Sequence, residues 1–350
     1  ALPENAVTTR PVFVETVVEK ISEITGSSEN ITIVDSPGAG IPYTESNLKK
    51  VYEKTGLADI SKRTGCRLNY DTGYSFLSFK GGKAIKKFEI INPVLNADMI
   101  INLPKFKTHD LTVITGAVKN MFGVVPGFLK PGYHARFNRV EDFSDMLVDL
   151  VMLVKPGLTI MDGILGIEGD GPGMSGTPRK IGLILASENP FSLDAVMAKI
   201  IGIGEELCPT LAAAKNRGIK GSAIGDVELL GEKLDVLALS NFVLPKNAGR
   251  EELIKNNFAR NYILPFIRNS LNPYPYVKKN KCTLCKTCVK VCPQKSIFIK
   301  DDSIKFDYKK CTRCFCCSEM CPEGAIELKD SLLGNFILNK LSWAGKGKKN

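Results

Sequence analysis

Eight of the eleven cysteines lie near the C-terminus in two copies of one pattern. Each copy has three cysteines spaced three residues apart, then a fourth cysteine four residues later that is followed by proline. Three thiolates this close in sequence can wrap one corner of an iron–sulfur cubane, while the fourth points away and ligates a neighbouring cubane. The spacing therefore predicts two [4Fe–4S] clusters, and a chain that holds them must fold both copies into one unit.

The expected ligand sets follow from this exchange of the fourth cysteine. They are Cys282, Cys285, Cys288 and Cys321 for one cluster, and Cys311, Cys314, Cys317 and Cys292 for the other. The alternatives are a zinc site or a disulfide framework, but zinc ribbons use pairs of Cys-x-x-Cys rather than this longer run. A short apolar alternation follows each run, at 295–299 and 324–328, and predicts a small strand over each cluster.

Three further cysteines fall outside these sets. Cys316 lies inside the second run, where it either competes for iron in a shifted register, tunes a cluster from close by, or packs there as a non-ligating thiol. Cys66 and Cys208 are far from the runs and from each other, which is typical of small buried apolar side chains. A redox or ligand role for these two is the alternative.

The positive charge of the chain is concentrated at its cysteine-rich end. From residue 246 onward there are 21 Lys and Arg against 9 Asp and Glu, whereas residues 1–245 hold 26 against 28. Lysines beside the cysteines offset the negative charge of a thiolate-ligated cluster. The remaining basic surface suits an acidic redox partner protein such as a ferredoxin. A nucleic-acid-binding face is not favoured, because few aromatic residues are interleaved with the lysines.

Residues 1–240 alternate between helical and strand patterns. This alternation predicts an α/β domain with a mainly parallel sheet and helices on both faces, joined to a small α+β ferredoxin-like double-cluster domain. The predicted helices are Pro11–Thr25, Glu45–Thr55, Val140–Val154 and Phe191–Ile201, and the predicted strands are 31–35, 97–103, 158–162 and 181–186.

We expect four units along the chain: the α/β domain with a candidate ligand pocket at 1–240, a helical connector at 241–276, the double-cluster module at 277–330 and an amphipathic basic tail at 331–350. The connector includes a predicted helix at 250–270. The tail either docks onto the protein or a partner subunit, or lies on an anionic membrane surface. There is no run of 18 apolar residues and no secretory signal, and reduced thiolates with oxygen-sensitive clusters predict a cytoplasmic location in an anaerobe.

Three polar segments directly follow predicted strands, at 102–109, 116–123 and 162–173. Ligands of such sheets bind beyond the carboxyl ends of the strands. The candidates for binding an anionic ligand or cofactor are Lys105, Lys107, Lys119, Asn120 and Arg136, and those for a metal or a sugar hydroxyl are Asp162, Glu168 and Asp170. The plainer alternatives are a solvated lysine edge and a histidine satisfied in the core.

His109 and Lys107 are the candidate catalytic residues. His109 is the only side chain near the candidate anion-binding lysines whose ordinary pKa lies close to 7, which suits a proton donor. The string Gly171-x-Gly173-x-x-Gly176 matches a dinucleotide-binding fingerprint, but a strand rather than a helix is predicted after it. A nicotinamide dinucleotide site is therefore not expected there.

These segments resemble a known family. The residues at 103–109, 116–123, 161–163 and 168–172, with Thr8-Thr9-Arg10-Pro11 and Asp35-Ser36-Pro37-Gly38, are similar to the pattern of the domain-of-unknown-function-362 family. Members of that family often carry a C-terminal double-cluster ferredoxin module. The resemblance implies an iron–sulfur protein with an α/β ligand-binding domain. The family usually has a further strand-containing stretch before Thr8, so we expect a trimmed chain.

The leading hypothesis is an iron–sulfur oxidoreductase. It would pass low-potential electrons through two [4Fe–4S] clusters to a small-molecule acceptor, an anionic ligand or cofactor held by the α/β domain. One alternative is a non-catalytic, ferredoxin-like electron carrier or subunit that docks a redox partner. Another is a binding module in which the clusters are structural.

Overall fold

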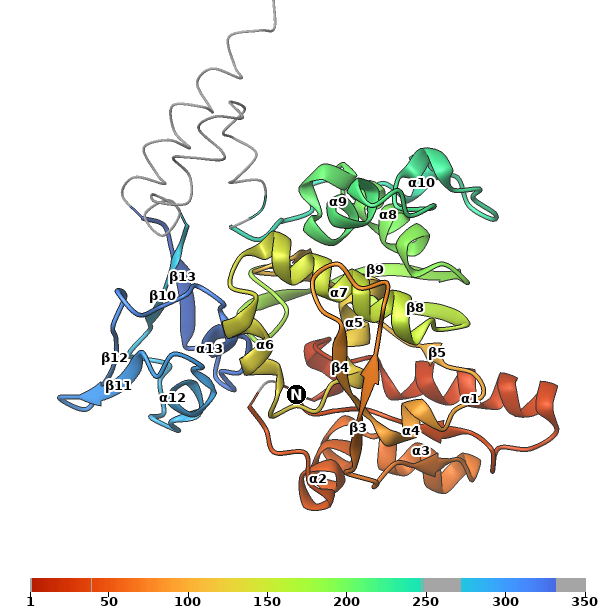
Figure 1. The fold of residues 1–350 in the computed structure, drawn as a ribbon, viewed down its shortest axis with the longest axis horizontal. Helices are drawn as coiled ribbons and strands as arrows, with labels where there is room; N and C mark the ends of the chain where they lie inside the picture. The colour runs from red at the N-terminus through yellow and green to blue at the C-terminus, as the bar shows by residue number, and fades with distance from the viewer. Residues whose placement is uncertain (1, 39, 247, 249–271, 332–350) are drawn as a thin grey trace, which may run out of the picture.

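The computed structural model describes residues 2–38, 40–246, 248 and 272–331 (Figure 1). A larger mixed α/β part lies beside a smaller cysteine-rich part, which is blue in Figure 1. The helix predicted at 250–270 and all but the first residue of the predicted tail lie outside the described residues. Among the described helices, none has both the length and the apolar character that crossing a membrane requires.

The helices of the larger part begin and end at residues that favour helix termini. Pro11 occupies the first turn of α1, which ends at Gly26 in the left-handed conformation. The Thr44 side chain caps α2 by accepting a hydrogen bond from the Asn47 amide. The helices are α1 (Pro11–Thr25), α2 (Glu45–Thr55), α3 (Leu57–Thr64), α4 (Asn92–Leu95), α5 (Gly116–Asn120), α6 (Lys130–Arg136), α7 (Val140–Val154), α8 (Pro190–Ile200), α9 (Pro209–Asn216) and α10 (Leu234–Leu237), with short 3-10 helices at Pro3–Asn5, Met121–Val124, Glu205–Leu207 and Ile224–Asp226.

Strand β8, which is as long as β9, lies at the centre of a five-stranded sheet. Strands β5 and β6 pair with β8 in parallel at successive points along its length, β9 pairs with it antiparallel, and β7 pairs antiparallel with β6. Two further pairs are separate: β1 with β2 in parallel, and β3 with β4 antiparallel. The strands are β1 (Thr32–Ile33), β2 (Arg67–Leu68), β3 (Tyr74–Ser78), β4 (Lys87–Ile91), β5 (Ile101–Asn102), β6 (Lys105–His109), β7 (Val113–Ile114), β8 (Leu158–Gly169) and β9 (Gly176–Ser187).

The predicted sheet was mainly parallel, but the observed sheets are small and mixed. The reason lies between β8 and β9, which are connected by residues 170–175 alone. A parallel return needs a crossover of a dozen residues or more, so this short connection makes the pair antiparallel. The predicted polar segment 162–173 therefore lies mostly in β8, and its last residues form the turn of a long hairpin. The strand expected after it is confirmed as β9.

Basic side chains of β6 lie on the side of the sheet opposite an apolar core. Helices α5 and α8 pack with β6, β8 and β9 around Phe106 and Met161. Alternate residues of a strand face opposite sides, so Lys107 and His109 face away from the core that holds Phe106. A second core lies around α7, and a third joins α1, α2 and α3.

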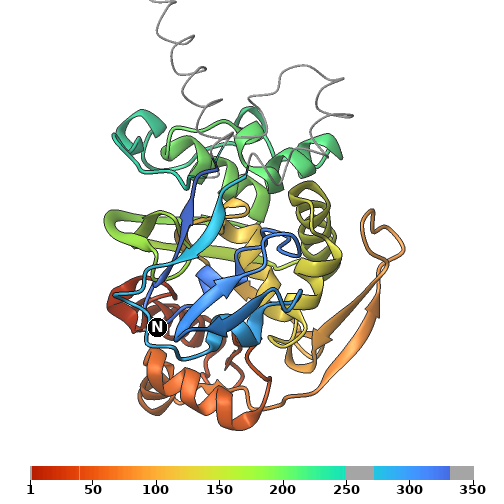
Figure 2. The same ribbon diagram turned by 90° about the vertical axis from the view of Figure 1, so that its left-hand side faces the viewer.

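The cysteine-rich part consists of two short antiparallel strand pairs and two short helices. Strand β10 pairs antiparallel with β13, and β11 pairs antiparallel with β12. Because β10 precedes the first cysteine run and β13 follows the second, the ends of the module are tied together (Figure 2). The elements are β10 (Tyr274–Val277), α12 (Thr287–Val291), β11 (Ile297–Lys300), β12 (Ser303–Phe306), α13 (Cys316–Glu319) and β13 (Ile326–Lys329). The two strands predicted after the runs are confirmed as β11 and β13.

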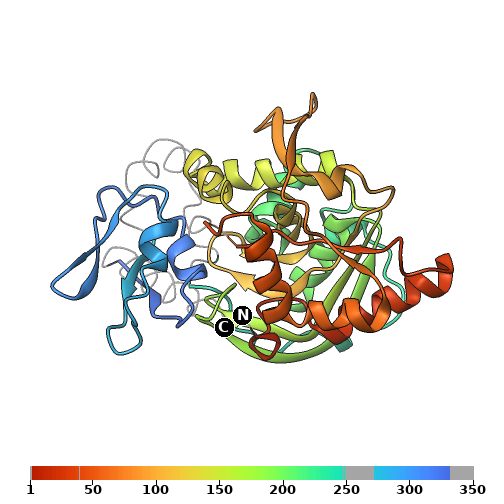
Figure 3. The same ribbon diagram turned by 90° about the horizontal axis from the view of Figure 1, so that it is seen from below.

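The two parts lie side by side (Figure 3). Glycines bring their backbones close together. A Cβ atom at Gly173 would lie 2.6 Å from the carbonyl oxygen of Glu319, and one at Gly324 would lie 2.8 Å from the carbonyl oxygen of Met174. Only glycine allows backbones to come this near. The Ser175 hydroxyl also donates a hydrogen bond to the Ile326 carbonyl, at 3.1 Å. The turn between β8 and β9 therefore packs directly against α13 and the segment leading to β13.

Candidate functional site

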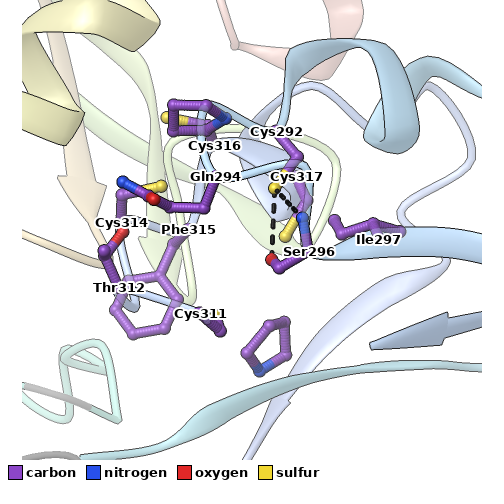
Figure 4. A pocket seen from close by; sticks show the side chains of 12 residues that line it. Cys292, Gln294, Ser296, Ile297, Cys311, Thr312, Cys314, Phe315, Cys316 and Cys317 are labelled. Carbon is purple, nitrogen blue, oxygen red and sulfur yellow. Dashed lines mark hydrogen bonds between the residues drawn. The ribbon is translucent and has the colours of Figure 1, made fainter. Parts of the chain in front are cut away.

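The cysteines of the two runs lie around two cavities in the cysteine-rich part. Cys282, Cys285, Cys288 and Cys321 line the first cavity. Cys292, Cys311, Cys314 and Cys317 line the second cavity together with Cys316 (Figure 4). Among the described residues, no group of three or more His, Cys, Asp or Glu side chains is placed to hold a metal ion. The eight cysteines of the runs nevertheless divide between the two cavities, four to each. Four thiols in one cavity are the donor set that a [4Fe–4S] cluster takes.

The backbone around the two cavities repeats the same geometry. The residues at equivalent positions in the two runs have left-handed φ angles between 49° and 64°: Leu284 and Arg313, Lys286 and Phe315, Lys295 and Gly324. Such residues turn successive N–H groups inward and form a concave site for negative charge. The Ser296 amide donates to the Cys292 sulfur at 3.3 Å, and the Ala325 amide donates to the Cys321 sulfur at 3.2 Å. These bonds would stabilise thiolates in a cluster.

The three remaining cysteines are all buried. Cys316 has no exposed surface and lies in the wall of the second cavity, beside Cys314. Cys66 packs in the core of α1 to α3, and Cys208 packs in the core beneath α8. Burial raises the pKa of the Cys208 thiol to about 12. Cys66 and Cys208 therefore lie where small apolar side chains are expected.

Five basic side chains meet beside the cysteine-rich part, and we call them the basic cluster. They are Lys107 and His109 on β6, Lys119 on α5, and Lys130 and His134 on α6. The ammonium nitrogens of Lys119 and Lys130 both lie 6.0 Å from the centre of the Phe122 ring. Lys107 donates a hydrogen bond to the Val7 carbonyl at 2.7 Å, and Lys130 donates to the Pro37 carbonyl at 3.0 Å.

The environment of the basic cluster lowers the pKa of each member. Burial lowers the pKa of Lys107 to about 8, reinforced by the charge of Lys119. Burial also lowers the pKa of Lys130 to about 8, although Asp35 and Glu319 oppose the shift. The pKa of Lys119 is lowered in the same way, against the opposing charges of Glu319 and Cys316. An anion that binds beside desolvated ammonium groups stabilises their charged form.

The two histidines each present a buried nitrogen that has no hydrogen-bond partner in the described structure. His109 accepts a hydrogen bond from the Leu111 amide at Nδ1, at 2.9 Å, so its proton lies on Nε2. That Nε2 is unpartnered, as is Nδ1 of His134. The His134 ring itself stacks on Phe143, with ring centres 4.3 Å apart.

His109 was predicted to be a proton donor because the ordinary pKa of histidine lies close to 7, but the pKa of His109 is lower in this fold. Burial lowers the pKa of His109 well below its ordinary value, and the nearby charge of Lys119 adds to the effect. Burial likewise lowers the pKa of His134 to about 4. Both imidazoles are therefore neutral near pH 7, and each can donate a hydrogen bond without carrying an extra proton.

Two carboxylates face the basic cluster, and one of them comes from the cysteine-rich part. Glu319, at the end of α13, places its carboxylate 3.8 Å from His109 Nε2. Burial alone would raise the pKa of Glu319, but Lys119, His134, Lys107 and Lys130 together lower it. Asp35 follows β1, and burial raises the pKa of its carboxyl group against the opposing charge of Lys130. The site is thus closed by a residue that lies between Cys317 and Cys321.

The other predicted binding residues have partners within the protein. Lys105 forms a buried ion pair with Asp162 at 2.6 Å, and Asp162 also accepts a hydrogen bond from the Arg10 amide. Asn120 donates to the Asn102 side chain at 2.7 Å. Three more are held elsewhere: Glu168 pairs with Arg179, Asp170 pairs with Lys246, and Arg136 lies over the Phe137 ring. Of the predicted residues, the structure brings together Lys107, His109 and Lys119, and ligand binding by the others stays a prediction.

Four residues of the site were not predicted as members of it. Lys130, His134 and Asp35 lie in segments separated by up to 99 residues, and Glu319 comes from the other part of the chain. A signal existed for Glu319, because an acidic side chain stands inside the Cys317-x-x-x-Cys321 loop where the flanking charges are basic. For Lys130 the signal was weaker, a lysine three residues before Tyr133-His134.

Comparisons with known proteins agree with this architecture. A family model described as "Domain of unknown function (DUF362)" matches residues 1–199, and one described as "4Fe-4S dicluster domain" matches residues 274–322. The chain is similar to the "Thylakoid-associated protein sll1697" of Synechocystis sp., with 29% identity over 277 residues that cover 76% of this chain and 80% of that protein. The expected cytoplasmic location and anaerobic host are not confirmed by these matches. The chain belongs to the DUF362 family and carries a 4Fe-4S dicluster domain at its C-terminal end.

Proposed function

We propose that this chain is an iron–sulfur electron-transfer protein that holds one [4Fe–4S] cluster in each cavity and reduces a small anionic ligand in the basic cluster. A bound [4Fe–4S] cluster supplies one-electron transfer. The observation that carries the proposal is the position of α13. This helix contributes Cys316 and Cys317 to the wall of the second cavity and Glu319 to the basic cluster.

The opposite side of the module suits an electron donor. Cys285 of the first cavity is exposed, and so are the neighbouring lysines Lys281, Lys286 and Lys290. An exposed thiolate ligand ringed by positive charge favours encounter with an acidic redox protein such as a ferredoxin. The first cavity would therefore face the donor, and the second cavity would face the basic cluster.

The basic cluster supplies both charge and a proton. Lys107, Lys119 and Lys130 would hold the anion, and the Nε2–H group of His109 would donate a hydrogen bond to it. We assign the proton donor to Lys107, because a pKa of about 8 leaves it protonated at pH 7 but able to lose that proton. His109, neutral at this pH, would orient the ligand.

Reoxidation of reduced protein tests the proposal. Anaerobic holoprotein is reduced with dithionite, freed of excess reductant, and mixed with each of a panel of phosphorylated and carboxylate metabolites while the cluster absorbance is followed. We expect at least one anion to reoxidise the wild type, and Lys107→Met and Lys119→Met to slow that reaction by about 100-fold. Lys62→Met, an exposed lysine of α3, is the matched control.

Wild-type rates in both variants at unchanged iron content would contradict the ligand site. If no anion reoxidises the wild type while a ferredoxin does, the electron-carrier alternative is favoured instead. Association with a membrane surface through residues 331–350 stays a prediction.

A further inference from the structure

The charges of the basic cluster do not balance locally. Three ammonium groups, those of Lys107, Lys119 and Lys130, face the carboxyl groups of Asp35 and Glu319. Without Glu319, three positive charges would remain against one carboxyl group. Two negative charges on a ligand would then neutralise the site, because isolated buried charge is costly and oppositely charged groups are its usual remedy.

The Glu319 carboxylate lies near the basic cluster but forms no direct hydrogen bond or ion pair with its lysines. Its carboxylate is 3.8 Å from His109 Nε2, which is too long for a hydrogen bond. In the described structure it forms no ion pair within 4.0 Å with Lys107, Lys119 or Lys130. The carboxylate is therefore held near the lysines by their charge, with no direct ion pair to any of the three.

Two imidazole nitrogens of the basic cluster have no hydrogen-bond partner among the described residues. Nε2 of His109 and Nδ1 of His134 are buried and unpartnered among the described residues, with the two side chains only 1% and 2% exposed. A buried donor without an acceptor costs about 1–3 kcal/mol. His109 Nε2 is such a donor, and with the three ammonium groups beside it the site favours a group with several acceptor oxygens over a single carboxylate.

We propose that the basic cluster binds a compact oxyanion carrying two negative charges, and that Glu319 is the internal carboxylate which this ligand displaces. The inference rests on the proposed anion site and adds the charge of the ligand and its competitor. Glu319 is suited to this role because its side chain is a quarter exposed and stands at the C-terminal end of α13, where it can turn outward. A tetrahedral phosphoryl or sulfuryl group and a dicarboxylate both satisfy this chemistry.

Calorimetric titration of the anaerobic full-length holoprotein tests the inference. The probes are sulfate for a tetrahedral dianion, oxalate for a dicarboxylate, and acetate for a single charge. We expect Glu319→Gln to bind sulfate or oxalate about tenfold more tightly than the wild type, and acetate to bind weakly to both. Glu319→Asp, which retains the charge, should keep the wild-type affinity, so that the gain follows charge rather than packing.

Two further variants serve as the negative and positive controls for this titration. Glu53→Gln, at an exposed glutamate of α2, should leave every affinity unchanged. Lys119→Met should abolish binding, and iron content is measured for each variant to verify that the clusters are retained. Preference for sulfate over oxalate would identify a tetrahedral group, and the reverse a dicarboxylate; either supports the inference.

The two ways of failing are distinguishable. If wild type and Glu319→Gln bind sulfate and oxalate with equal affinity, Glu319 is not a competitor and the inference is wrong, while the anion site stands. If neither protein binds any of the three probes, the anion site is wrong and the proposed function is wrong with it.

Discussion

Lys107 and His109 lie two residues apart on β6 and face the same basic cluster. Burial lowers the pKa of both, with opposite consequences for proton transfer. The shift brings Lys107 to about 8, near physiological pH, and takes His109 away from it. A lysine is thus the group that can exchange a proton here, and the histidine serves as a fixed neutral donor.

Anion affinity should therefore depend on pH. Lys107 and Lys130 carry full charge below their pKa of about 8 and lose it above, and a bound anion favours the charged form. The charged groups that face these two lysines do not reverse the direction in which affinity changes with pH. They are Lys119, Asp35 and Glu319. We expect sulfate affinity to be constant near pH 6.5 and to fall by about tenfold or more by pH 9.5.

Calorimetry with sulfate measures this directly, because sulfate keeps its double charge over the whole range. Lys107→Met should weaken binding at pH 7 and make the pH dependence shallower. An affinity for sulfate that does not change between pH 7 and 9.5 would show that these lysines do not hold the anion.

At the scale of elements, α5 is positioned by a buried carboxyl group. Asp194 of α8 accepts hydrogen bonds from the backbone amides of Ala117 and Val118 at the start of α5. Gly116 precedes them with a φ of 55°, and a Cβ atom there would lie 2.1 Å from an oxygen of Asp194. The orientation of Lys119 thus depends on a glycine one turn earlier.

Gly116→Ala should destabilise the protein and loosen the site. The left-handed φ costs an alanine about 1–2 kcal/mol, and the added methyl group displaces a buried hydrogen-bond acceptor. Gly132→Ala in α6 is the matched control, because open space surrounds that position and alanine favours a helix. We expect a lower Tm for Gly116→Ala and an equal or higher Tm for Gly132→Ala, measured anaerobically on the holoprotein. An unchanged Tm for Gly116→Ala would contradict this account of α5.

Local patterns predict the elements better than their arrangement. Helices α1, α2 and α7 lie at their predicted bounds, because their periodicity and termini are encoded by neighbouring residues. The mixed pairing of the sheet depends on the turn at residues 170–175, between β8 and β9. The conformation of this turn depends on the segments that pack against it. Lys107, His109 and Lys119 could be predicted because their segments come soon after predicted strands, although the structure places Lys107 and His109 within β6. Lys130, Asp35 and Glu319 reach the site only through long-range packing.

At the scale of the whole molecule, the two parts work as one unit only if their contact is maintained. The turn between β8 and β9 contacts α13 at Gly173, and the loop after β1 contacts it where Gly38 meets Met320. Val291 of α12 packs against Gly40. These contacts hold Glu319 in the basic cluster and fix the second cavity beside it.

Gly173→Ala should loosen this contact without unfolding either part. The new methyl group would lie 2.6 Å from the Glu319 carbonyl oxygen, so α13 must move away. We expect faster amide hydrogen exchange in residues 170–175 and 316–320 with unchanged iron content. Gly225→Ala, where no atom lies within 4 Å of the added group, should leave exchange in both segments as in the wild type. Unchanged exchange in the Gly173→Ala protein would show that the turn between β8 and β9 is not in close contact with α13.

Metal analysis and electron paramagnetic resonance of the anaerobically purified full chain test the central claim most directly. The eight cysteines of the two runs line two cavities, and one cysteine of each four comes from the other run. We expect about eight irons and about eight acid-labile sulfides per chain, and a dithionite-reduced spectrum of two interacting [4Fe–4S] centres. Zinc in place of iron, or about four irons with the signal of one isolated centre, would contradict it.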